Sequence, residues 1–191
     1  MKLILASTSR YRKALLSRLN IPFEVAAPDV DETPLFNEAP QVLASRLAHA
    51  KALKVALDYT DALVIGSDQV ACCGETLLGK PGTHDKAVKQ LLLLSGREAV
   101  FHTALCVHNC ATGITLRRNV SNRVLFRTLT AARIERYLRI EQPYDCAGSA
   151  KSEGLGIALI QRLSGDDPNA LIGLPLIALV DLLSEHGLEI P

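Results

Sequence analysis

The feature of this sequence that most constrains its fold is a repeated alternation between short apolar runs and segments with helical periodicity. Residues 3–6 form an apolar run, and the segment that follows places Tyr11, Leu15 and Leu19 on one stripe. A short apolar run is typical of a buried strand, and a period of about 3.6 residues is typical of an amphipathic helix. The chain is therefore expected to begin with a strand and then a helix, whose N-cap is Ser9.

The same alternation continues along the chain and predicts the fold class. Further strands are predicted at residues 23–26, 62–66, 99–107, 114–126 and 157–163, and further helices at 40–57, 85–94, 131–140 and 175–185. The two longer strands are expected to form a hairpin. Strands that alternate with helices predict an α/β protein with a mixed twisted sheet and helices on its faces. In such folds ligands bind beyond the carboxyl ends of strands.

Composition and charge exclude several classes of partner. The chain has 191 residues, 48% of them hydrophobic, which suits a single domain with its own core. The formal net charge of +1 predicts neither a nucleic-acid partner nor a membrane partner. No apolar stretch approaches the roughly 20 residues that span a bilayer, and the first apolar run is too short for a signal peptide. Five cysteines without a CxxC pair favour reduced thiols, so we expect a cytoplasmic protein.

The first segment that carries chemistry lies where the first strand is expected to meet the first helix. Ser7 and Ser9 bring hydroxyl groups to a helix N-terminus, and Arg12 brings a guanidinium fork that fits phosphate oxygens. The segment therefore predicts an anion site. The alternative is that Ser9 only caps the helix while the basic side chains face solvent.

Carboxylates gather in the second and third segments. Asp29, Asp31 and Glu32 lie in a loop, and oxygen ligands of this kind suit a hard divalent cation. A solvated acidic loop is the simpler interpretation unless another carboxylate converges on it. Asp68 can supply that carboxylate from the end of the strand at 62–66. An aspartate directly after an apolar run is either a turn-former or a functional group, and function is favoured because Gln69 and Val70 show no turn chemistry.

The remaining basic residues of interest lie in loops with small residues. Lys80 follows Gly79, and Lys151 and Glu153 lie in a glycine-bearing loop at 148–156. Small residues let a backbone approach a ligand closely, although a plain surface loop fits the same pattern. The sequence contains no Walker P-loop, no GxGxxG and no metal-binding histidine spacing, which disfavours the common ATPase and dinucleotide-binding classes.

Taken in order, these segments resemble the Maf family of nucleotide pyrophosphatases. The similarity covers residues 5–9 with Arg12, 30–33, 65–69, 79–81, 148–154, 167–169 and 172–176. The resemblance implies a single two-lobed domain over residues 1–191 with a cleft, a homodimer, and cleavage of a nucleoside triphosphate to the monophosphate and pyrophosphate. It also implies a divalent metal cation, Mg²⁺ or Mn²⁺. Ser67-Asp68-Gln69 is similar to the subgroup that acts on 7-methyl-GTP, whereas the subgroup for dTTP and UTP usually carries Asp-Thr at the last two positions.

The resemblance also assigns roles. Asp68 is the implied proton acceptor, and Arg12, Gln69 and Glu153 are implied to govern substrate choice. The residues themselves predict phosphate ligands and metal ligands; the phosphate ligands are Ser7, Ser9, Arg12, Lys51, Lys80 and Lys151, and the metal ligands are Glu32 and Asp68. The chain departs from the family at Arg10, where Pro is usual, and at Tyr11, where Arg is frequent.

Two other functions remain open from the sequence. One is a pyrophosphatase that prefers another canonical or modified nucleotide, such as dTTP, UTP or ITP. The other is a nucleotide-binding regulator of cell division without catalysis. All need phosphate and base sites, but only an enzyme needs Asp68 and a metal.

Overall fold

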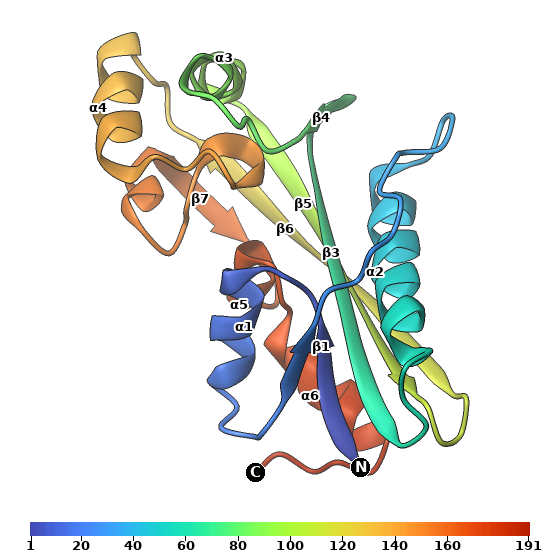
Figure 1. Cartoon of the computed structure of the whole chain (residues 1–191). Helices are drawn as coiled ribbons and strands as arrows, with labels where there is room; N and C mark the ends of the chain where they lie inside the picture. The colour runs from blue at the N-terminus through green and yellow to red at the C-terminus, as the bar shows by residue number, and fades with distance from the viewer. The chain divides into compact units, whose positions relative to one another are not determined.

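The structure is a computed structural model that describes residues 1–191, and its helices and strands are labelled in Figure 1. The strands are β1 (Lys2–Ala6), β2 (Glu24–Ala26), β3 (Ala62–Cys73), β4 (Thr76–Leu78), β5 (Glu98–Asn109), β6 (Thr115–Phe126) and β7 (Ile160–Ser164). The helices are α1 (Arg10–Ser17), α2 (Pro40–Ala56), α3 (His84–Leu94), α4 (Ala131–Glu141), α5 (Pro168–Ile172) and α6 (Leu176–Glu185), with short 3₁₀ helices η1 (Ala147–Ser149) and η2 (Leu155–Leu159).

All seven strands belong to one mixed sheet. Its order is β2-β1-β3-β5-β6-β7, and β4 pairs with β3. β1 runs parallel to both β2 and β3, whereas β4 is antiparallel to β3 and β7 is antiparallel to β6. The predicted mixed α/β fold is therefore confirmed.

The chain folds into two compact units. The first unit comprises Met1–Gln69, His102–Val120 and Asp167–Pro191, and the second comprises Val70–Phe101 and Ser121–Asp166. The long strands β3, β5 and β6 each contribute residues to both units. Each unit is therefore assembled from segments that are far apart in the sequence.

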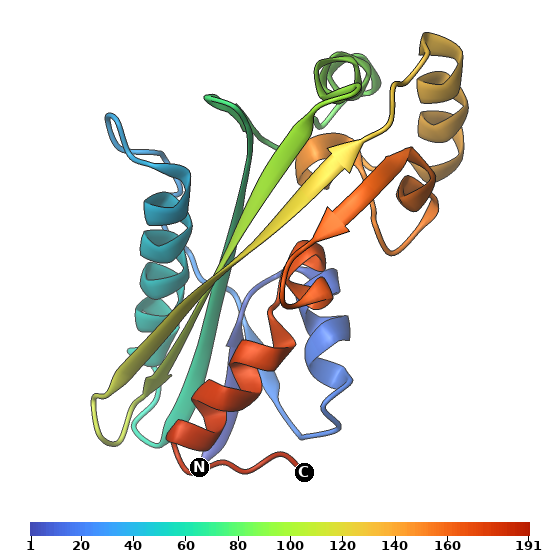
Figure 2. The ribbon, with the colours of Figure 1, turned by 180° about the vertical axis from the view of Figure 1, so that it is seen from behind.

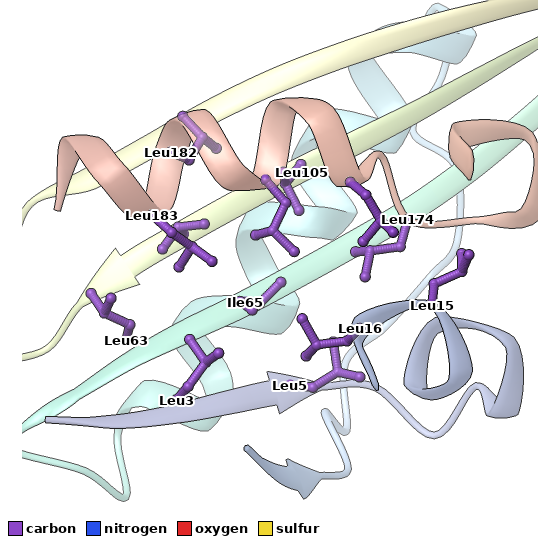
Figure 3. Packing of buried hydrophobic residues seen from close by; sticks show 13 residues of the cluster. Leu3, Leu5, Leu15, Leu16, Leu63, Ile65, Leu105, Leu174, Leu182 and Leu183 are labelled. Carbon is purple, nitrogen blue, oxygen red and sulfur yellow. The ribbon is translucent and has the colours of Figure 1, made fainter. Parts of the chain in front are cut away.

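The first unit has a core made mainly of leucine. α1 and α6 lie on one face of its strands and α2 lies on the other (Figures 1 and 2). Figure 3 shows Leu183 of α6 on the side of the helix that faces Leu63 and Ile65 of β3, and all three belong to this core. Residues two apart on a strand share a face. Leu63 and Ile65 of β3 therefore lie on the α6 side of the sheet, whereas Val64 and Gly66 lie on the α2 side.

α2 approaches β3 closely because Gly66 has no side chain. A Cβ atom built on Gly66 would collide with the carbonyl oxygen of Ala48 and would lie 2.7 Å from the backbone nitrogen of Ala52. Ala48 and Ala52 are themselves small and fully buried. Small residues on both elements therefore bring the helix backbone against the strand, one residue away from Lys51.

In the second unit, α3 packs against α4. This unit also contains residues 70–73 of β3, 98–101 of β5 and 121–126 of β6. Its buried side chains include Leu91 and Leu94 of α3, Phe101, Phe126, and Ile134 of α4. None of the helices in either unit combines the length and apolar character needed to cross a membrane.

Several predicted boundaries are wrong. The strand predicted at 62–66 does not end at Ser67, because β3 continues to Cys73, where its last residues pair with β4. The strand predicted from residue 157 begins at Ile160, because residues 155–159 form η2. β4 and α5 were not predicted, since each is short and has no periodic pattern. Ser9 is confirmed as the N-cap of α1, with its side chain accepting from the Arg12 amide.

An ion pair holds the acidic loop on α2. Arg46 Nε lies 2.7 Å from Glu38 Oε1, and Arg46 Nη2 donates to the carbonyl of Thr33 at 3.0 Å. Glu38 also accepts a bond from the Leu35 amide. The Arg46 guanidinium and the Leu35 amide lower the pKa of Glu38 to about 2. The loop that contains Glu32 is thereby fixed against the helix that carries Lys51.

We predict that Gly66→Ala destabilises the protein by about 1–3 kcal/mol or more, because the added methyl group forces α2 away from β3. Urea unfolding measures this change, and Gly79→Ala is the matched control because a Cβ at Gly79 meets nothing within 4 Å. Equal stability of the two variants would contradict the close approach of α2.

We predict that the Glu38–Arg46 ion pair makes the free energy of unfolding fall at acidic pH. The folded pKa of Glu38 lies below its ordinary value, so the ion pair stabilises the fold above about pH 4.5 and this contribution disappears as the pH falls toward 2. The difference in free energy of unfolding between the parent and Glu38→Gln should therefore be largest above pH 5.5 and shrink on acidification. The control is Glu75→Gln at an exposed position. A difference for Glu38→Gln that is constant with pH would rule out the ion pair as its source.

Candidate functional site

The candidate site lies where β1 ends and its neighbour β3 continues. Ala6 is paired with Gly66, so the chain leaves the sheet at Ser7 while β3 runs on through Ser67 and Asp68. Ser7 is buried, and its Oγ accepts a bond from the backbone nitrogen of Ser9 at 3.1 Å. Ser7 and Ser9 thus lie at the N-terminus of α1, as predicted. Ser67 and Asp68 of β3 therefore lie just beyond the last residue that pairs with β1.

The centre of the site is a lysine shared by two carboxylates. Lys51 Nζ lies 2.6 Å from Asp68 Oδ1 and 2.6 Å from Glu32 Oε1. The side chains of Lys51 and Asp68 are 7% and 10% exposed, whereas that of Glu32 is 59% exposed. The metal-site hypothesis required a further carboxylate beside the acidic loop, and Asp68 supplies it. The site thus combines a buried ion pair, Lys51 with Asp68, and an exposed carboxylate, Glu32.

The other two carboxylates of the acidic loop do not join this group. Asp31 Oδ1 accepts from the Thr33 amide at 2.9 Å, and the bonds from Thr33 lower the pKa of Asp31. Asp29 is exposed. Only Glu32, the last carboxylate of the acidic run, reaches Lys51.

Arg12 extends the site from α1. Its Nε donates to the carbonyl of Gly173 at 2.8 Å, which leaves the terminal nitrogens of the guanidinium for other partners. Burial lowers the pKa of Arg12, and the negative charges of Asp68 and Glu32 act in the opposite direction. An arginine at a helix N-terminus, within the field of two carboxylates, suits a ligand that carries both phosphate and metal.

Backbone carbonyls at the end of α5 hold the side chains of β3. Gln69 Nε2 donates to the carbonyls of Ala170 and Leu171 at 2.9 and 3.1 Å and to Thr103 Oγ1 at 3.0 Å. Ser67 Oγ donates to the same Gly173 carbonyl that Arg12 uses, at 3.0 Å. Because a carbonyl only accepts, the amide nitrogen of Gln69 faces α5 and its oxygen faces away. Thr103 was not predicted as a site residue, because a buried threonine in a strand has no distinctive sequence signal.

Three predicted residues lie in the second unit. Lys80 is exposed in the loop after β4, and Glu153 is exposed in the segment between η1 and η2. Lys151 Nζ lies 3.3 Å from Glu141 Oε1, and its backbone amide donates to Tyr137 at 3.1 Å. Burial raises the pKa of the Tyr137 hydroxyl, which stays a neutral hydrogen-bonding partner.

Glu141 anchors this segment and was missed from the sequence. Its Oε2 accepts from the Leu155 amide at 2.8 Å, and Gly154 approaches it so closely that a Cβ there would lie 2.9 Å from the same oxygen. Gly156 likewise has no room for a Cβ beside the backbone of Lys151. The glycines of this segment therefore permit a tight turn around Glu141, and a helix-terminal glutamate alone could not have indicated that role.

The structure thus brings seven of the predicted residues together in the first unit, namely Ser7, Ser9, Arg12, Glu32, Lys51, Asp68 and Gln69. The other three, Lys80, Lys151 and Glu153, lie in the second unit. The group in the first unit can bind an anion through Arg12, Lys51 and the start of α1. It can also accept a proton at Asp68.

A divalent cation fits the donor set of the first unit. Glu32 and Asp68 offer carboxylate oxygens beside one another, which is the chemistry that Mg²⁺ and Mn²⁺ prefer. No group of three or more His, Cys, Asp or Glu side chains in the structure could hold a metal ion by itself. The remaining ligands would have to come from the substrate or from water.

Comparison with known proteins identifies the family of the chain. A model of the family described as Maf-like protein matches residues 2–186. A 7-methyl-GTP pyrophosphatase from Methylobacillus flagellatus is 57% identical over 188 residues, which cover 98% of each chain. Another protein of that name, from Thiobacillus denitrificans, is 56% identical over 98% of this chain and 94% of its own.

A solved structure supports the fold. A HAM1 protein from Coxiella burnetii superposes with a TM-score of 0.57 over 97% of this chain and 99% of its own, at 16% identity. Similarity at that level concerns the fold alone. The motif resemblance, in contrast, is confirmed by the family match over nearly the whole sequence. The chain therefore belongs to the Maf-like protein family.

Proposed function

We propose that this protein is a nucleoside triphosphate pyrophosphatase that hydrolyses 7-methyl-GTP to 7-methyl-GMP and pyrophosphate. The observation that carries the proposal is the buried Asp68 held by Lys51 beside Glu32, at the N-terminus of α1. Nucleotide pyrophosphatase activity is supported by family membership and by near full-length relatives of that name. The choice of 7-methyl-GTP rests on the same relatives and on the Ser67-Asp68-Gln69 motif.

In the proposed reaction a water molecule attacks the α-phosphorus and Asp68 takes its proton. The bond between the α-phosphorus and the bridging oxygen breaks, and pyrophosphate leaves with the electron pair. Lys51 donates to Asp68 Oδ1, so Oδ2 is the atom proposed to take the proton. Arg12 and Lys51 offset the negative charge that develops on the phosphoryl oxygens.

Glu32 and Asp68 are the residues that would hold a divalent cation, Mg²⁺ or Mn²⁺, which would withdraw charge from the phosphate when bound. Lys80 and Lys151 are proposed to bind the outer phosphates. Ser7 and Ser9 are proposed to bind phosphate at the start of α1.

Base choice is proposed to rest on Gln69 and Glu153. The free face of Gln69 is its oxygen, because its nitrogen is engaged by α5, and an oxygen accepts from the N–H groups of guanine. Methylation at N7 gives the base a positive charge, which the exposed carboxylate of Glu153 favours. The homodimer and the cytoplasmic location implied by the family resemblance stay predictions.

The proposed reaction is tested with purified protein and a panel of triphosphates that includes 7-methyl-GTP, GTP, dTTP, UTP and ITP. With Mg²⁺ or Mn²⁺ we expect the highest kcat/KM for 7-methyl-GTP, with the monophosphate and intact pyrophosphate as products. Excess chelator should abolish turnover because clustered carboxylates and a triphosphate repel one another without a bridging cation. Orthophosphate as the first product would place the cut elsewhere, and preference for another nucleotide would overturn the substrate assignment.

For Asp68 we predict that Asp68→Asn lowers single-turnover hydrolysis by on the order of 10² or more. The amide keeps the size of the side chain but cannot take the proton. Nucleotide affinity should survive because Lys51 still has Glu32 as a partner.

The matched control is Asp58→Asn, which makes the same change at an exposed position. Melting temperatures of both variants report whether the fold is intact. An Asp68→Asn protein that folds and hydrolyses 7-methyl-GTP at the parental rate would show that Asp68 is not the proton acceptor.

A further inference from the structure

One side chain of α3 connects two loops of the second unit that carry the proposed phosphate ligands. Gln90 Nε2 donates to the carbonyl oxygen of Gly79 at 3.0 Å, directly before Lys80. On its other side, Gln90 Oε1 accepts from Ser149 Oγ at 2.5 Å, two residues before Lys151. The loops are far apart in the sequence, and α3 also contacts η1 directly.

The loop at Ser149 needs such an anchor because its backbone is strained. Gly148 has φ 74° and Ser149 has φ 53°, so two successive residues adopt left-handed conformations, and the second is not a glycine. Such conformations persist only where surrounding structure holds them. Ser149 is fully buried, and its hydroxyl bond to Gln90 is a contact that can hold it.

The two bonds require an amide at position 90. The Gly79 carbonyl can only accept, so the atom facing it must carry a hydrogen, and the atom facing Ser149 must accept one. Glutamine satisfies both at once. An ionised glutamate would place an oxygen against the Gly79 carbonyl, whereas a protonated carboxyl again offers one donor and one acceptor.

We propose that Gln90 is a positioning residue for the phosphate-binding loops, because its amide sets the placement of Lys80 and Lys151 together. The proposal rests on the proposed function in taking these two lysines as phosphate ligands. Gln90 itself is hydrogen-bonded to both loops and is assigned no role in the chemical step.

The test is Gln90→Glu, compared with the parent from pH 5 to pH 8 on whichever triphosphate the parent hydrolyses best. The ordinary pKa of a glutamate is about 4.3, and the facing carbonyl raises it. We expect kcat/KM to fall by about tenfold or more at pH 8, and the ratio of variant to parent to recover as the pH falls and the carboxyl gains its proton. Effects of pH that are common to both proteins cancel in the ratio.

Gln161→Glu is the control, because it adds the same charge at an exposed position on β7 of the same unit. Ser149→Ala is the second variant, since it removes one of the two bonds without adding charge, and it should also lower kcat/KM. A ratio for Gln90→Glu that is parental, or lowered equally at every pH, would overturn the proposal.

Hydrogen exchange provides a readout that needs no turnover. The amides of Gly82 and Ser149 donate to the carbonyls of Tyr144 and Cys146 within these loops. They should exchange faster in Gln90→Glu at pH 8 than in the parent, and at the parental rate once the carboxyl is protonated. If the parent hydrolyses no triphosphate, the proposed function fails, and unchanged exchange in both loops would then refute the role of Gln90 independently.

Discussion

The burial of the Lys51 ammonium between Asp68 and Glu32 is the interaction on which the rest of the site depends. A buried charge that loses its only partner costs on the order of 3–5 kcal/mol, and here each of the two carboxylates can compensate Lys51 if the other is removed. The pair forms only if α2 lies directly against β3, and Gly66 with Ala48 and Ala52 makes that approach possible. The clamp between Arg46 and Glu38 then keeps the acidic loop within reach. The ion pairs of Lys51 therefore depend on the close packing of α2 against β3.

In both units, hydrogen bonds from neighbouring residues hold the side chains that are proposed to meet substrate, although the residues differ. In the first, carbonyl groups at the end of α5 hold Gln69, Ser67 and Arg12, so a turn without a charged side chain orients the polar groups of β3 and α1. In the second, the Glu141 carboxylate accepts from the Lys151 ammonium and from the Leu155 amide. In both units, hydrogen bonds from neighbouring groups orient the residues proposed to meet substrate. Such support keeps a binding site organised before its ligand arrives.

Much of the fold could be predicted from periodicity alone. The strand, the capped helix with Ser9, the long helix over residues 40–56 and the hairpin of β5 and β6 all appear close to their predicted positions. The prediction was wrong where local pattern and tertiary pairing disagree. Ser67 and Asp68 look like the end of a strand because polar residues rarely continue a buried one. They continue it here because β3 pairs with β4 further on and because Lys51 neutralises Asp68.

The sequence by itself determined the fold class, the family and the residue types available for chemistry, because these follow from periodicity and from short contiguous motifs. Only the tertiary structure decided which carboxylate of the acidic loop meets Lys51, which atom of Gln69 stays free, and that Glu141, Thr103 and Gln90 support the neighbouring residues. Those outcomes depend on the directions of hydrogen bonds between segments far apart in the chain. The directions of these hydrogen bonds cannot be predicted from the local sequence, because the packing of strands and helices sets them.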